Sequence, residues 1–117
     1  MSTIDPTRLE EAILGRLRSF VPDGVHLAGG TVDQLLGSWD VTSEWDEALE
    51  FVSRRFLEDL QEDVILQLHE GWPSPTGTLP EPEVEILRED GVIRLSFVDG
   101  DAVSLVLPDI PFEEFSS

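Results

Sequence analysis

Apolar residues repeat with a helical period along the first half of the chain and with a period of two along much of the second half. Near the N-terminus, Asp5 followed by Pro6 is typical of a helix start, and the apolar positions after it predict a helix that ends near Phe20. Thr31, with Gln34 three residues later, matches a capping box. A second, shorter helix is therefore expected to begin at Thr31.

A third helix is predicted by the longest stripe of apolar residues at helical spacing. Ser43 is its candidate N-cap. The stripe consists of Trp45, Leu49, Val52, Phe56 and Leu60. From Val64 onward the apolar residues alternate with polar ones, so we expect the first strand to begin there, with Leu66 on its apolar face and His69 on its polar face.

Two hairpins are predicted from the requirement that apolar residues share one face of the sheet. A two-residue turn at 90–91 would place Ile86 opposite Leu95. At the next turn two loop residues would mix the two faces, whereas three loop residues, 99–101, would place Leu95 opposite Leu105. The alternation then runs on to a proline-rich segment near the C-terminus.

The order of the elements predicts an α+β fold. We expect two or three N-terminal helices, the third of them the longest, packed on a C-terminal antiparallel meander of three to four strands. The third helix should cross the apolar face of the sheet and bury residues such as Phe56 against Leu66 and Leu95. Residues 1–117 are expected to form a single domain, in which residues 108–117 are a candidate flexible tail rich in acids and aromatics.

The chain has 25 acidic residues, seven arginines and no lysine, for a formal net charge of -18 at neutral pH. Residues 1–22 are neutral, and the acids are densest in residues 40–63 and 81–114. Such a surface repels nucleic-acid phosphates and anionic lipids within a screening length of about 8 Å at physiological salt, and it attracts basic proteins. Direct nucleic-acid or membrane binding is therefore not expected.

Catalytic chemistry is poorly supported by the residues present. The chain has no cysteine, lysine or tyrosine, and none of its serines lies in a nucleophile elbow. His26 and His69 have no evident catalytic partner. Glu83 and Glu85 would share a strand face and could act as a carboxylate pair, but such pairs arise by chance in so acidic a chain. We therefore do not expect an enzyme.

Metal and anion sites are equally weak in the sequence. Residues 99–101, Asp-Gly-Asp, lack the spacing of a calcium-binding loop, so we interpret them as a hairpin tip. Residues 29–31, Gly-Gly-Thr, precede a helix but lack the lysine and the other elements of a phosphate-binding loop. We expect no cofactor and no bound metal ion at either place.

The N-terminal segment carries charged residues where a signal peptide would be apolar, and the chain has no apolar stretch long enough to span a membrane. A cytoplasmic location is therefore expected. The sequence leaves the oligomeric state open.

These observations favour a small, acidic, non-catalytic module that binds a basic protein partner, as an inhibitor, an immunity-type antagonist, a chaperone or a DNA mimic. A salt-adapted housekeeping domain and a carboxylate-based enzyme are the alternatives. Acids on the third helix, and aromatics and acids outside regular structure, are the candidate binding residues. They are Glu47, Glu50, Glu58, Trp72, Phe112, Glu113, Glu114 and Phe115.

Overall fold

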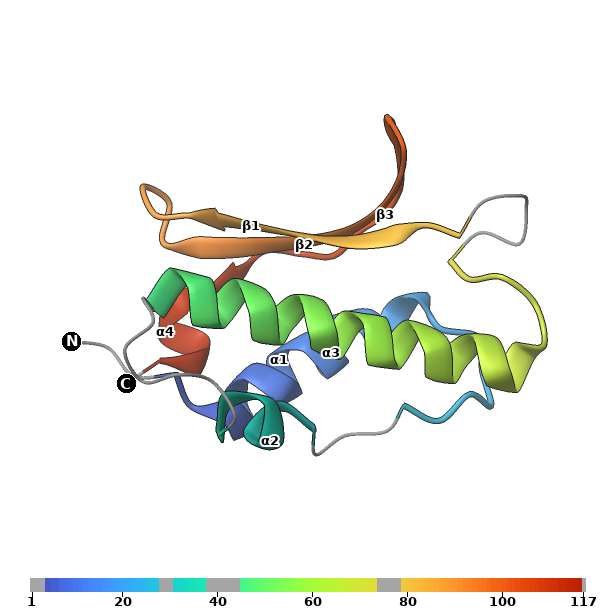
Figure 1. Ribbon diagram of the computed structural model, residues 1–117, viewed down its shortest axis with the longest axis horizontal. Helices are drawn as coiled ribbons and strands as arrows, with labels where there is room; N and C mark the ends of the chain where they lie inside the picture. Colours follow the sequence, from blue (N-terminus) through green and yellow to red (C-terminus); the bar gives the residue numbers. More distant parts are fainter. Residues whose placement is uncertain (1–3, 28–30, 38–44, 74–78, 117) are drawn as a thin grey trace.

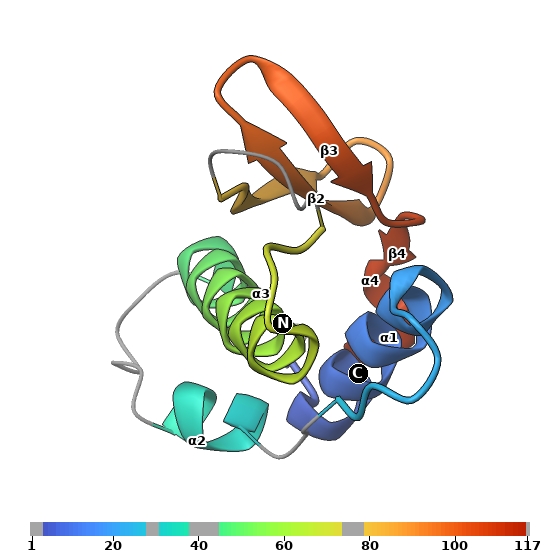
Figure 2. The same ribbon diagram turned by 90° about the vertical axis from the view of Figure 1, so that its right-hand side faces the viewer.

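The computed structural model describes residues 4–27, 31–37, 45–73 and 79–116, and it has the predicted α+β architecture: helices first, then an antiparallel sheet. The sheet forms one layer, α3 and α1 lie side by side against one of its faces, and α2 lies on the far side of these helices (Figures 1 and 2). The elements are α1 (Pro6–Leu17), η1 (Arg18–Phe20), α2 (Thr31–Gly37), α3 (Trp45–Leu68), β1 (Glu81–Leu87), β2 (Val92–Asp99), β3 (Ala102–Val106), β4 (Ile110–Pro111) and α4 (Phe112–Phe115).

The start of α1 follows from its first residues. An oxygen of the Asp5 carboxylate accepts hydrogen bonds from the backbone N–H groups of Thr7 and Arg8 at 3.0 and 3.3 Å, and Pro6 occupies the first helical position. These bonds satisfy amide groups that have no partner within the helix. The predicted N-cap is therefore confirmed.

The longest helix, α3, begins at Trp45, and its candidate cap Ser43 lies outside the described residues. The prediction that a strand begins at Val64 is wrong, because the helix continues to Leu68. Val64 is fully buried, four residues after the buried Leu60, so the helical face simply extends. Leu66, which created the apparent alternation, projects into solvent.

The end of α3 is set at His69, which was expected on a strand and instead has a positive φ of 59°. Its backbone N–H donates to the carbonyl oxygen of Ile65 at 2.8 Å. A left-handed residue with this hydrogen bond is a common helix C-terminus, and glycine is the residue usually found there.

Replacing His69 with glycine is expected to raise the free energy of unfolding by about 1 kcal/mol. The left-handed conformation raises the free energy of a residue with a Cβ atom, whereas glycine adopts it without this cost. His69→Ala retains the Cβ atom and should give no such gain. Urea denaturation of the three proteins measures the difference. Equal stabilisation by both substitutions would show that the backbone conformation is not the cause.

The strand order is β1-β2-β3, and β4 pairs with β2 on the same side as β3. The first hairpin has a four-residue loop, not the predicted two, so Ile86 lies opposite Ile93 and Leu95 opposite Val84. In the loop, the Asp90 amide donates to the Leu87 carbonyl at 3.2 Å. The register therefore differs from the prediction by two residues, which leaves every side chain on its predicted face.

The second hairpin also differs from its prediction. Asp99 pairs with Ala102, so the loop has two residues rather than three. The register then shifts between Phe97 and Val98, which leaves Ser104 as an extra residue on β3. This β-bulge places Leu105 opposite the buried Phe97 on the inner face, whereas Val103 and Val106 of β3 are exposed.

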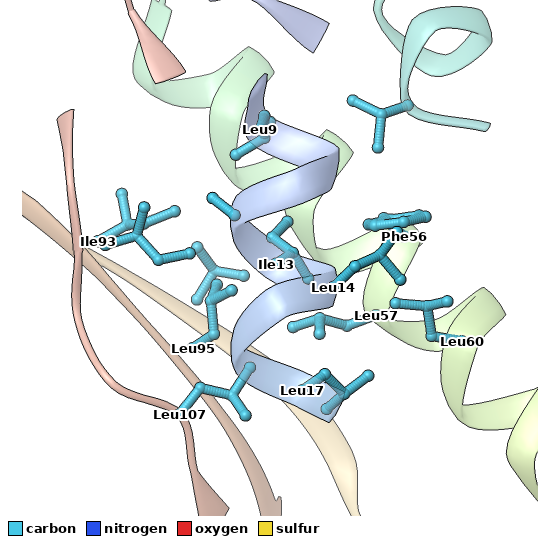
Figure 3. Close-up of a cluster of buried hydrophobic side chains, with 14 of the residues drawn as sticks. Leu9, Ile13, Leu14, Leu17, Phe56, Leu57, Leu60, Ile93, Leu95 and Leu107 are labelled. Atoms are coloured by element: carbon cyan, nitrogen blue, oxygen red, sulfur yellow. The ribbon is translucent and has the colours of Figure 1, made fainter. Parts of the chain in front are cut away.

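The hydrophobic core lies between the sheet and the two helices on its inner face. Side chains from α1, α3 and β2 converge there, so α1 packs on the sheet together with α3, which agrees with the prediction of N-terminal helices packed on the meander (Figure 3). Leu66 is not part of this core, contrary to expectation, because 65% of its surface is exposed. The largest fully buried side chains of the core include Phe56, Phe97, Phe115, Leu9, Ile13, Leu17, Leu57, Leu60, Ile93 and Leu95.

The C-terminal segment, a candidate flexible tail in the sequence, forms β4 and α4 and packs against the beginning of the chain. The Asp5 amide donates to the Phe115 carbonyl at 2.8 Å, and Ile4 forms a bridge with Ser116. The Phe112 amide donates to the Gly91 carbonyl at the tip of the first hairpin, also at 2.8 Å. The described residues near the two ends of the chain are therefore bonded to one another, and the C-terminal segment is also bonded to the first hairpin.

Candidate functional site

The aromatic residues predicted to anchor a partner pack inside the protein. Trp72 is only 6% exposed and contacts Phe97 edge-on, with ring centroids 5.5 Å apart. Phe115 is fully buried, and Phe112 is half-buried against Trp45 at 5.1 Å between ring centroids. These side chains cover the ends of the core, so they fold back on the domain.

The acids predicted on α3 lie on its surface, but two of them are paired within the helix. An oxygen of Glu50 lies 2.8 Å from a guanidinium nitrogen of Arg54, and one of Glu58 lies 3.5 Å from Arg55. Glu47 is exposed in the first turn. Exposed pairs of this kind are worth a few tenths of a kcal/mol, so they remain easy to exchange for a partner's charges.

On α4, Glu113 is exposed, and Glu114 has a structural role. Arg16 of α1 donates two hydrogen bonds to the Glu114 carboxylate, at 2.6 and 2.9 Å. This two-point contact joins α1 to α4, so Glu114 belongs to the contacts that hold the C-terminus in place.

The arginines are used mainly in pairs of this sort. In the described part of the chain the pairs include Arg8–Asp5, Arg16–Glu114, Arg54–Glu50, Arg55–Glu58, Arg55–Asp59, Arg88–Asp46 and Arg94–Asp109. Arg94 donates to both carboxylate oxygens of Asp109, at 3.0 and 3.1 Å, and these hydrogen bonds hold the pKa of Asp109 below its ordinary value. Most of the described arginines are thus each bound to particular acids.

The sheet carries a row of acids that were not among the predicted binding residues. Glu81, Glu83 and Glu85 alternate along β1, and all three are exposed on the face away from the helices. Glu85 lies opposite Arg94 on β2, whereas Glu81 and Glu83 face the uncharged Val98 and Ser96. We call these three residues the β1 acidic row. Their period-two spacing in the sequence was the signal that could have identified them.

A groove of about 560 Å³ lies between the C-terminal half of α3 and the segment that leads into β1. Leu66 and Leu79 line it, and they are 65% and 53% exposed. Glu62 and Glu81 also line it, so the β1 acidic row begins at its edge. We call this feature the α3–β1 groove.

One wall of the groove is fixed by Gln61, which is 4% exposed. Its side-chain amide nitrogen donates to the carbonyl oxygens of Trp72 and Pro80, at 3.0 and 2.7 Å. A buried polar side chain with both of these bonds holds Trp72 and Pro80 against α3. No local sequence pattern indicates this contact, because Trp72 and Pro80 lie 11 and 19 positions after Gln61.

The described residues offer little for catalysis or metal binding. No group of three or more histidine and acidic side chains among them could hold a metal ion. The Ser53 hydroxyl is buried in α3 without a hydrogen-bond partner, out of reach of a substrate. None of the described helices is long and apolar enough to cross a membrane. Gly29 and Gly30, the glycines of the candidate anion site, lie outside the described part of the chain.

Comparison with known proteins gives no relationship from which a function could be carried over. No protein-family model matches the sequence, and no curated protein or solved structure matches it significantly.

Proposed function

We propose that the protein is a non-catalytic binding module that engages a basic protein partner. The observation that carries this proposal is the β1 acidic row, three exposed carboxylates on one strand of a chain with a formal net charge of -18. Carboxylates two residues apart on a strand lie about 7 Å from one another, a spacing that an extended basic segment can match with alternate side chains.

The distribution of charge supports binding over general salt adaptation. Arg16 on α1, Arg54 on α3 and Arg94 on β2 are each paired with one acid. Glu81 and Glu83, in contrast, face uncharged residues across the strand pair. Like charges held close together on one face raise the free energy of the protein alone, and a cationic partner relieves that cost. The field of the row also speeds the encounter with such a partner at low ionic strength.

The proposal predicts that Glu81→Lys with Glu83→Lys weakens binding of a short lysine- and arginine-rich peptide by about tenfold or more at low salt, since each reversal replaces an attraction with a repulsion across several ångströms. Fluorescence anisotropy of the labelled peptide measures this change. Neither position lies opposite Arg94, so the fold should tolerate both.

Glu11→Lys with Asp23→Lys is the matched control, because it changes the net charge equally at exposed positions far along the chain from β1. It should weaken binding much less. Equal losses in the two variants would show that net charge, not the β1 acidic row, attracts the peptide. If no basic peptide binds the native protein and its melting temperature climbs steeply toward molar salt, the salt-adapted housekeeping domain becomes the better explanation.

A further inference from the structure

We infer that the α3–β1 groove is the specificity site of this module, and that it takes one large apolar side chain from a partner segment whose flanking residues are lysine or arginine. This inference rests on the proposed function and adds to it the class of segment recognised. Charge alone would draw many basic proteins, whereas a groove beside the charge selects among them.

The apolar part of the argument is the exposure of two leucines in one place. Leu66 projects from α3 and Leu79 from the segment before β1, and more than half of each side chain is in contact with solvent. Isolated exposed leucines are ordinary on protein surfaces, but two that line the same groove offer a continuous apolar surface. The remaining apolar lining comes from Ile65, Pro80 and Pro82.

The charge around the groove determines what can enter it. Glu62 and Glu81 are exposed at its edge, and Glu58 also contributes to the lining. The one cationic side chain in the lining, Arg54, is paired with Glu50 at 2.8 Å. An acidic segment would be repelled, and an uncharged one would gain nothing from these carboxylates. A segment with basic residues on both sides of its apolar residue fits both features.

The groove is formed before any partner arrives. The two hydrogen bonds from Gln61 hold the carbonyl groups of Trp72 and Pro80 in place, and Pro80 is part of one wall of the groove. A preformed site avoids the free-energy cost of ordering a loop on binding, so more of the contact energy appears as affinity. Its volume of about 560 Å³ is within the range of ordinary ligand sites.

The test uses two labelled peptides, both short and rich in lysine and arginine, that differ at one central residue, leucine in one and serine in the other. The native protein is expected to bind the leucine peptide about tenfold or more tightly than the serine peptide. Burial of one leucine side chain contributes enough binding free energy for a difference of this size. In a variant with Leu66→Ser and Leu79→Ser, this preference should disappear while the affinity for the serine peptide stays unchanged. Val103→Ser, at another exposed apolar residue, should preserve the preference.

The outcomes separate this inference from the proposed function. If the native protein binds both peptides equally, or if the variant with Leu66→Ser and Leu79→Ser keeps the preference, the groove is not a specificity site. The proposal that the protein binds a basic partner would not be affected by this result. If neither peptide binds, the proposed function fails as well. Both leucines are exposed, so the variants should remain folded, and the comparison of the two peptides on the native protein requires no variant.

Discussion

Replacing Phe115 with alanine is expected to lower the free energy of unfolding by about 3–5 kcal/mol, a large part of the stability of an ordinary small domain. The Phe115 ring is fully buried and stacks on Trp45, with centroids 6.3 Å apart and planes 14° from parallel. Truncation would leave a cavity where α4 closes the end of the core and would separate Trp45 from its neighbour. Urea denaturation followed by tryptophan fluorescence measures the loss.

Glu113→Ala is the control for this substitution, because Glu113 lies on the same short helix and is exposed. Its removal should change the free energy of unfolding by no more than about 0.5 kcal/mol. If Phe115→Ala were as mild as Glu113→Ala, the C-terminal segment would not be part of the cooperative fold. Its aromatics would then again be candidates for partner binding.

The sequence predicted best those elements whose formation depends on neighbouring residues. The N-cap of α1 needs only Asp5, Pro6 and the amides that follow, and it formed as expected. The stripe from Trp45 to Leu60 belongs to one helix for the same reason. These features depend on interactions within one or two turns, which a sequence pattern reports directly.

The wrong strand at Val64 has a more informative cause. An exposed leucine at position 66 breaks the helical stripe and creates the alternation of a strand. The same leucine lines the α3–β1 groove. Local rules of sequence patterning tend to fail where a side chain is placed for binding instead of packing. The segment that was predicted wrongly therefore contains the residue on which the inferred specificity depends.

The pairing of the strands could not be derived in full, because a turn of two, three or four residues can keep the same residues on the same face. In the first hairpin the longer loop moved each partner by two positions. In the second, the bulge at Ser104 corrected a register that the loop alone would have put out of phase. The candidate site was harder still to predict, since Leu66 and Leu79 lie in different segments and line the same groove only in the folded protein.

The second large effect is expected at Gln61. Gln61→Met keeps the length of the side chain but removes its amide, so the carbonyl oxygens of Trp72 and Pro80 lose their donor in a buried place. Each unsatisfied buried acceptor costs about 1–3 kcal/mol, and we expect a total loss of about 2–4 kcal/mol in the free energy of unfolding. Chemical denaturation of the variant measures it.

Gln67 provides a closely matched control, because its amide also joins α3 to a loop by two hydrogen bonds. Its nitrogen donates to the His26 carbonyl at 2.6 Å, and its oxygen accepts from the His26 amide at 2.8 Å, but both residues are exposed. Water can replace those bonds, so Gln67→Met should cost less than about 1 kcal/mol. Equal costs at the two positions would mean that burial is not what makes Gln61 important. A large cost at Gln61 alone, together with a weaker preference for the leucine peptide, would show that the same amide stabilises the fold and shapes the groove.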